Sequence, residues 1–133
     1  AEESRLVLKK FIDEAIVHFS ADKDRVTLLG FSQGAIMSYS IALTFPGFVS
    51  GIIALSGRIL KEIRPAVASS GHEKLRVFIG HGTEDTVLRI GFAREAKEYL
   101  ATLNISPEYH EYPIAHGISK QEQDDVLEWF KKS

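Results

Sequence analysis

Hydrophobic residues recur at intervals of three and four over four stretches of the chain, which is the spacing of a helix with one apolar face. The first stretch runs from about Glu2 to Ser20, with charged residues between its apolar positions, which are Leu8, Phe11, Ile12, Ala15, Ile16 and Phe19. The other three helices are expected over about residues 33–45, 88–103 and 120–131. The first is therefore predicted to be an amphipathic helix that buries one face.

The last of these helices has a clear starting signal. Ser119 followed by Glu122 has the S-x-x-E spacing of a capping box, in which side chain and backbone at the helix start hydrogen-bond to each other. Further along this helix, the apolar residues Val126, Leu127 and Phe130 are expected to face the core.

Short apolar runs lie between the helices, at residues 26–29, 49–55 and 75–79, and a fourth run at 108–113 alternates aromatic and polar residues. Such runs suit the strands of a parallel sheet that is covered on both faces. The stretch 58–74 fits either a short helix or irregular chain. Helices and strands thus alternate, which predicts one three-layer α/β domain over residues 1–133 with a mainly parallel sheet.

Composition excludes several classes of function. Hydrophobic residues make up 44% of the chain and charged residues 26%, as in an ordinary globular domain. The net charge of −2 gives no electrostatic case for binding nucleic acid, and the absence of cysteine excludes disulfides and thiolate metal sites. No apolar run has the length of a membrane-spanning helix, and the first residues lack the features of a signal peptide. A cytoplasmic location without an integral membrane segment is expected.

Candidate chemistry begins at the pentapeptide Gly30-Phe-Ser-Gln-Gly34, which follows the first apolar run and opens the second helix. A G-x-S-x-G sequence between a strand and a helix is typical of a nucleophile elbow. Such a turn strains the backbone of the serine, and Gly30 and Gly34 would let strand and helix approach each other without Cβ clashes. Ser32 Oγ would then stand clear of the sheet, close to the positive end of the helix.

A serine nucleophile needs a base, and the base needs an acid to hold its tautomer. Functional side chains of a parallel α/β sheet gather at the carboxyl ends of its strands. His116 follows the fourth run and is the candidate base, while Glu84 and Asp85 follow the third and are both candidates for the acid. Asp85 has the shorter, less mobile side chain, although it could instead cap the next helix. For His81, between two glycines, backbone packing or a hydrogen bond that shapes the turn is expected.

Other kinds of site fit less well. G-x-S-x-G does not have the spacing of a dinucleotide-binding loop or a P-loop. His110 and His116 lack the i, i+4 spacing of a helical zinc site, so neither a metal nor an organic cofactor is expected. Tyr109, Tyr112 and Trp129 are expected to be packing residues and not a platform for stacking bases.

Three blocks of the chain together resemble the phospholipase/carboxylesterase family of α/β-hydrolases, which includes carboxylesterases, lysophospholipases and acyl-protein thioesterases. The blocks are Gly30 to Gly34, His81-Gly-Thr-Glu-Asp-Thr-Val87, and Tyr109-His-Glu-Tyr-Pro113 followed by His116-Gly-Ile-Ser119. Their order is that of the α/β-hydrolase triad, serine then acid then histidine. Thr86 stands where the family often has proline, which is a small departure.

The resemblance implies a role for each site residue. Ser32 would be the nucleophile, Asp85 the acid and His116 the base, and the backbone N–H of Gln33 would be one donor of the oxyanion hole. The implied reaction is the hydrolysis of carboxylic esters or thioesters, of small molecules or lipids, through an acyl-enzyme on Ser32. No cofactor is implied.

Family members also have strands before the first helix of this chain, and the loop after one of those strands gives the second oxyanion donor. This chain is therefore expected to hold only the carboxyl-terminal portion of the fold, with about four strands, and to be weak or inactive alone. The strand at 26–29 would be left with an open apolar edge, to be covered by a preceding segment or by a second copy in a homo-oligomer. The alternative function is a non-catalytic interaction module that pairs with another chain through this edge.

Overall fold

Helices and strands alternate along the chain, as the hydrophobic pattern predicts. The computed structural model describes residues 2–132. Its elements are α1 (Glu2–His18), β1 (Thr27–Phe31), α2 (Gln33–Thr44), β2 (Gly51–Leu55), the 3₁₀ helix η1 (Lys61–Ala66), β3 (Arg76–Gly82), α3 (Ile90–Thr102), β4 (Glu108–Tyr112) and α4 (Lys120–Lys131). The stretch 58–74, for which the sequence left two alternatives open, contains η1 within otherwise irregular chain.

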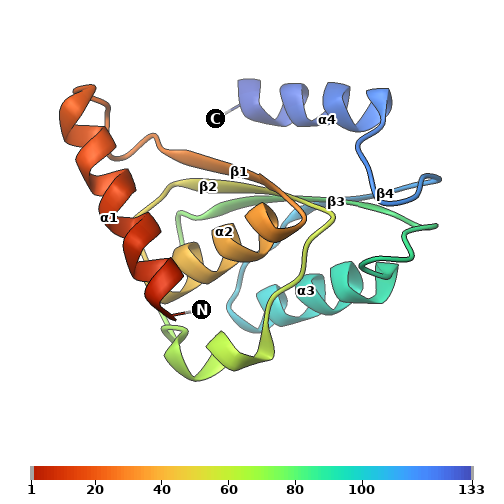
Figure 1. Ribbon diagram of the computed structural model, residues 1–133, viewed down its shortest axis with the longest axis horizontal. Coiled ribbons are helices and arrows are strands. Elements are labelled where there is room, and N and C mark those ends of the chain that lie inside the picture. Colours follow the sequence, from red (N-terminus) through yellow and green to blue (C-terminus); the bar gives the residue numbers. More distant parts are fainter. Residues whose placement is uncertain (1, 133) are drawn as a thin grey trace.

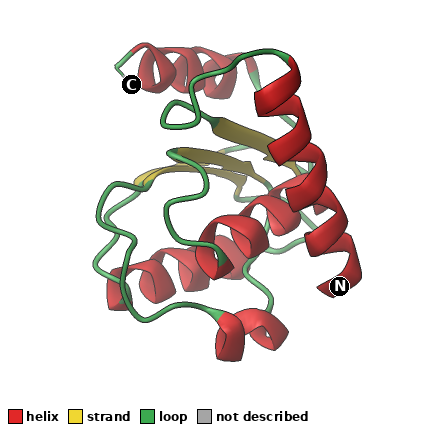
Figure 2. Cartoon of the chain, turned by 90° about the vertical axis from the view of Figure 1, so that its left-hand side faces the viewer, coloured by secondary structure: helices red, strands yellow, loops and turns green. Residues whose placement is uncertain are grey.

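The four strands form one sheet in the order β1-β2-β3-β4, and every neighbouring pair is parallel. Figure 1 shows α4 on one face of this sheet and α2 and α3 on the other, with α1 beside α2. The view turned by 90° in Figure 2 shows the same layers from the side. The predicted three-layer α/β architecture with a parallel sheet is confirmed.

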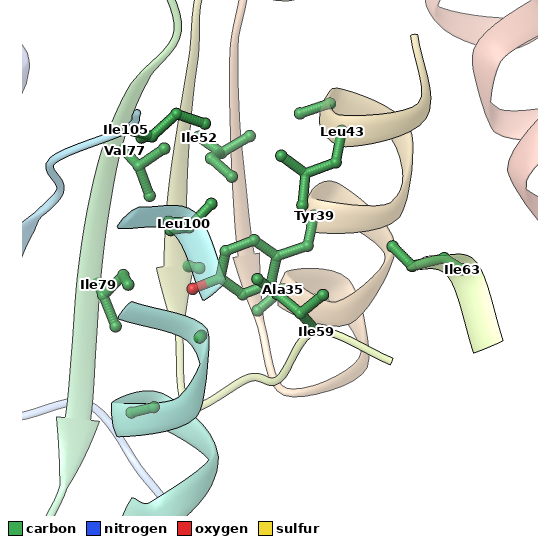
Figure 3. Packing of buried hydrophobic residues seen from close by; sticks show 14 of the residues in the cluster. Ala35, Tyr39, Leu43, Ile52, Ile59, Ile63, Val77, Ile79, Leu100 and Ile105 are labelled. Carbon is green, nitrogen blue, oxygen red and sulfur yellow. The ribbon is translucent and has the colours of Figure 1, made fainter. Parts of the chain in front are cut away.

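Most of the buried apolar residues lie between the sheet and the helices α2 and α3. Tyr39 of α2 is 1% exposed and lies close to Ile79 of β3 and Leu100 of α3 (Figure 3). Full burial of each large apolar side chain stabilises a fold by about 1.5–3 kcal/mol. On the opposite face, a smaller cluster consists of Ile53, Leu55, Phe78 and Trp129. This double coverage explains why the residues of β2 are apolar throughout.

Helix α1 buries much less of its apolar face than its spacing predicts. Ile12 is its one buried residue among those described, whereas Phe11 is 64% exposed and Phe19 is 75% exposed. The helix packs beside α2 at one end of the sheet. The predicted buried face is therefore partly correct, since Leu8, Ala15 and Ile16 are half-buried beside Ile12, and wrong at Phe11 and Phe19.

The core-facing residues predicted for α4 are also partly wrong. Trp129 is buried and Val126 packs beside it, but Leu127 and Phe130 are about half exposed. At about 100° per residue, positions 122, 126 and 129 share one side of a helix, while 130 lies at its flank and 127 lies on the far half. Trp129, expected only to be a packing residue, is thus the main apolar anchor of α4.

Strand β1 forms one edge of the sheet, as the sequence predicts. Leu28 packs against the core, but on the other face of the strand Leu29 is 59% exposed and Phe31 is 37% exposed. The strand also runs two residues beyond the predicted run 26–29. An edge strand with free backbone groups and an apolar face can pair with a further strand.

The turn from β1 into α2 depends on one glycine. A Cβ atom on Gly30 would collide with backbone atoms of Gly34 and Ala35, so the first turn of α2 can lie on β1 only because residue 30 has no side chain. A Cβ atom on Gly34 would meet nothing within 4 Å. The predicted need for glycine is therefore supported at residue 30 and not at residue 34.

Glu122 is a buried carboxylic acid in the first turn of α4. Its side chain is 0% exposed, and neither carboxyl oxygen has a partner with hydrogen-bond geometry among the described residues. Ser119 caps the helix by accepting the N–H of Glu122 at 3.1 Å, which forms one half of the predicted capping box. Burial raises the pKa of Glu122 from its ordinary 4.5 to about 7, partly offset by the backbone N–H of Ser119.

The two glycines of the elbow offer a matched test. We expect Gly30→Ala to lower the free energy of unfolding by about 1–3 kcal/mol or more, because the added methyl group overpacks the contact with α2. Gly34→Ala should be neutral or stabilising by up to about 1 kcal/mol, because alanine is the better helix former and the site is open. Urea denaturation of both variants measures the difference. Equal effects of the two substitutions would contradict this account of the turn.

Glu122 predicts a pH-dependent stability. Its folded-state pKa lies above the unfolded value, so its contribution to stability is fully present below pH 4.5 and is lost as the pH rises through about 7. Glu122→Gln should remove this loss, so the variant should gain roughly 2–3 kcal/mol relative to the parent between pH 4 and pH 8. Glu128→Gln, at an exposed position of the same helix, is the control. Denaturation at several pH values measures both, and a difference that does not vary with pH would contradict the prediction.

Candidate functional site

Ser32 lies in a strained turn between β1 and α2. Its backbone has φ 57° and ψ −113°, in the positive-φ region that costs a non-glycine residue of order 1–3 kcal/mol. The Ser32 N–H donates to the carbonyl of Leu55 at 2.9 Å, which ties the turn to β2. The side chain makes no capping hydrogen bond to α2. Its hydroxyl therefore remains available to other groups.

Asp85 is buried in the loop between β3 and α3, and Glu84 beside it is exposed. Asp85 Oδ1 accepts the backbone N–H groups of Val87 at 2.9 Å and Leu88 at 2.8 Å. Helix α3 begins at Ile90, so Asp85 organises the turn before the helix and is not its cap. Of the two candidate acids, Asp85 is the one whose carboxylate is fixed in place.

The electrostatics of Asp85 combine two opposing effects. Burial by itself raises the pKa of the carboxyl, but hydrogen bonds from His116, Leu88 and Val87 lower it by more, so the pKa lies below its ordinary value. A carboxylate that accepts several hydrogen bonds stays ionised even where water is excluded. Asp85 is thus a buried negative charge at neutral pH.

His116 joins the other two residues. Its Nδ1 donates to Asp85 Oδ2 at 2.6 Å, and its Nε2 lies 3.1 Å from Ser32 Oγ. Because Nδ1 keeps its proton and donates it in the hydrogen bond to the carboxylate, Nε2 carries no proton and is free to accept the hydroxyl proton of Ser32. The imidazole also packs against the ring of Phe31, with 4.9 Å between ring centroids. The three predicted site residues therefore form one chain of hydrogen bonds, while their catalytic roles remain predictions.

Two loops have to meet for this chain to form, and their backbones hold them together. The N–H groups of Thr83 and Glu84 donate to the carbonyls of Tyr112 and Ile114, at 2.8 and 3.0 Å. A side chain on Gly82 would collide with the backbone of Ile114, so residue 82 must be glycine for the loops to touch. Sequence analysis did not single out Gly82. Its place between a strand and the candidate acid was the available signal.

Gln33 is the first residue of α2, so its backbone N–H has no acceptor within the helix. This N–H follows directly on Ser32 in the chain, and its role as an oxyanion donor stays a prediction. No group of three or more His, Asp or Glu side chains within residues 2–132 is arranged to hold a metal ion. Over the same residues, no helix has both the length and the apolar character needed to cross a membrane.

Comparisons with known proteins show the family and the fold to which the chain belongs. The model of the phospholipase/carboxylesterase family matches residues 2–133. Among curated proteins, acyl-protein thioesterase 1 of Debaryomyces hansenii is 32% identical over 123 residues, which covers 90% of this chain and 53% of the relative. Acyl-protein thioesterase 1 of Kluyveromyces lactis is 30% identical over 137 residues, which covers 99% of this chain and 60% of the relative.

Among solved structures, the Bacillus cereus carboxylesterase matches with a TM-score of 0.86 at 23% identity, covering 99% of this chain and 63% of that one. Esterase PE8 gives the same TM-score at 24% identity, covering 98% of this chain and 60% of that one. These likenesses show the fold, and the chain spans a little over half the length of its relatives. The match to the family model shows that the chain belongs to the phospholipase/carboxylesterase family of α/β-hydrolases.

Proposed function

We propose that this domain hydrolyses carboxylic esters or thioesters through an acyl-enzyme on Ser32. The observation that carries the proposal is the hydrogen-bonded series Ser32–His116–Asp85 at the carboxyl edge of the sheet. Membership of an esterase family supports it independently.

In the proposed reaction, Ser32 Oγ attacks the acyl carbonyl while its proton passes to His116 Nε2. Asp85 keeps the imidazole in the required tautomer and stabilises the imidazolium that forms. When the tetrahedral intermediate collapses, the imidazolium returns the proton to the departing alcohol or thiol. Water, deprotonated by the same Nε2, then attacks the ester carbonyl and releases the acid from Ser32.

The N–H of Gln33 supports this reaction as one donor to the oxyanion, aided by the positive end of α2. A second donor would come from outside the residues described. Loss of one such donor lowers turnover by about 10²–10³-fold. We therefore infer that the chain by itself reacts slowly and that full activity belongs to a complete domain.

Names of relatives suggest the substrate class. They include acyl-protein thioesterases and a carboxylesterase, which points to an acyl ester or thioester of a small molecule, lipid or protein. Phe31, Val87 and Ile118 are exposed apolar residues within two positions of the three site residues in sequence, and would suit an acyl chain. A cytoplasmic location is part of the proposal.

A fluorophosphonate probe tests the nucleophile. We expect it to label Ser32, detected by intact mass and peptide mapping, at a rate about 10²–10³-fold below that of a complete carboxylesterase such as the Bacillus cereus enzyme. Ser32→Ala should abolish labelling. Labelling of another residue, or labelling that survives His116→Ala undiminished, would overturn the proposal. Labelling as fast as in the complete enzyme would overturn only the inference that the chain alone is slow.

Ser56→Ala is the matched control for this experiment. Ser56 also follows a strand and also has a positive φ, of 54°, but its Oγ is buried without a hydrogen-bond partner among the described residues. Its Oγ makes no hydrogen bond to a base among the described residues, so it should not react. The variant should therefore label at the parent rate.

A second candidate function is suggested by the exposed face and open edge of β1. We infer that, in the isolated chain, a second copy covers this edge, whereas in the longer relatives the region outside the match would do so. Under this reading the fold acts as an interaction module, and binding would survive Ser32→Ala.

Leu29→Lys tests the edge. The side chain is 59% exposed, so the substitution should change stability by no more than about 0.5 kcal/mol. A lysine on an edge strand opposes pairing, and self-association measured by sedimentation should weaken at least ~10-fold. Val17→Lys, at an exposed position of α1, is the control and should leave association unchanged. A chain that is monomeric at all concentrations would contradict the inferred homo-oligomer.

A further inference from the structure

His81 is a buried polar residue that the proposed reaction does not use. It lies near the carboxyl end of β3 and is 1% exposed. Its Nε2 lies 2.6 Å from the carbonyl oxygen of Leu88, in the loop that carries Asp85. A buried imidazole without a hydrogen bond would destabilise the fold. The bond to Leu88 offsets this cost of burying His81.

The contact fixes the tautomer of the ring. A carbonyl oxygen can only accept, so His81 Nε2 carries a proton and donates it to Leu88. The other ring nitrogen, Nδ1, is buried and has no hydrogen-bond partner among residues 2–132. The bond to Leu88 is thus the one hydrogen bond that the ring makes within the described chain.

Leu88 connects this histidine to the candidate acid. Its carbonyl accepts from His81, while its N–H donates to Asp85 Oδ1 at 2.8 Å. The N–H of Val87 donates to the same oxygen at 2.9 Å. His81 therefore bonds to the peptide group that follows Leu88, and the two preceding peptide groups bind the carboxylate.

His81 also lies close to the carboxylate of Asp85 itself. His81 Nε2 lies 3.5 Å from Asp85 Oδ2, the oxygen to which His116 donates, and both side chains are fully shielded from solvent. The loop is not rigid by composition, since Thr86 occupies the position where proline would restrict the backbone. The turn is held by the bonds of Asp85 to its backbone, and His81 is a buried side chain that adds a further bond at Leu88.

We propose that His81 is a positioning residue for the acid of the triad: its bond to Leu88 holds the turn whose N–H groups bind Asp85, and so sets Asp85 for His116. The proposal rests on the proposed function for its catalytic meaning. Its structural content can be tested without any activity.

His81→Leu and His81→Gln form the test, in the full chain. Leucine fills the site but cannot donate, whereas glutamine offers an N–H near the position of Nε2. Two NMR measurements report on the turn. One is hydrogen exchange of the Val87 and Leu88 amides, and the other is the downfield proton of His116 Nδ1 bound to Asp85, which is assigned by its loss in Asp85→Asn.

In His81→Leu we expect the two amides to exchange at least ~10-fold faster and the downfield proton to shift or broaden. In His81→Gln both signals should stay close to those of the parent. His72→Leu is the matched control. His72 is also buried, at 4% exposed, and its Nε2 also donates to a backbone carbonyl, that of Ala68 at 2.8 Å. It precedes the first residue of β3, at the opposite end of the strand from His81. The control variant should lower Tm comparably without changing either signal.

Unchanged signals in His81→Leu, or equal changes in His72→Leu, would overturn the proposal. If His81→Leu does not fold, His81→Gln decides, because a folded glutamine variant that loses both signals would show that a donor to Leu88 is not what sets Asp85. Failure of the serine to react with fluorophosphonate would not alter these NMR results. The two proposals can therefore fail separately.

Discussion

The contact of the first turn of α2 with Gly30 of β1 is the constraint on which the site depends. Only a residue without a side chain allows the helix to start that close to the strand. The chain must then reverse within one residue, and Ser32 takes the strained positive-φ conformation in consequence. The strain is borne by neighbouring interactions, among them the bond from Ser32 N–H to Leu55 on β2. The position of the hydroxyl is thus a result of backbone packing.

The parallel sheet by itself brings Asp85 and His116 near Ser32. Each strand ends at the same edge, so the loops after β3 and β4 meet beside the turn after β1. The two loops must also be held at a fixed distance from each other. The backbone hydrogen bonds between residues 83–84 and 112–114 hold them there. The buried carboxylate of Asp85 is then stabilised by three N–H donors, one from an imidazole and two from the backbone. The carboxylate of Asp85 is therefore buried together with its partners.

Much of this could be predicted from the sequence, because the relevant signals are local. The helices and strands follow from periodicity, the elbow from its glycines, and Asp85 and His116 from their places after strands. The extent of burial could not be predicted, since it depends on which elements lie opposite. Phe11 and Phe130 have the spacing of core residues, yet no described element covers them, and Trp129 takes the central place in α4. Likewise, the role of Gly82 depends on a loop about thirty residues further along the chain, whose approach no local pattern encodes.

The order of the strands has a consequence for how the domain reaches its structure. Because β1, β2, β3 and β4 are neighbours both in the chain and in the sheet, each new pairing closes only the crossover that has just been completed. Ser32 and His116 are 84 residues apart, but three pairings of neighbouring strands span this separation, so no single loop has to close it. This strand order keeps the sequence separation of the paired strands smaller than a pairing of distant strands would, although every parallel pairing still has to close a crossover. The complete site requires the pairing of β4 with β3, because only that pairing brings the base beside the nucleophile.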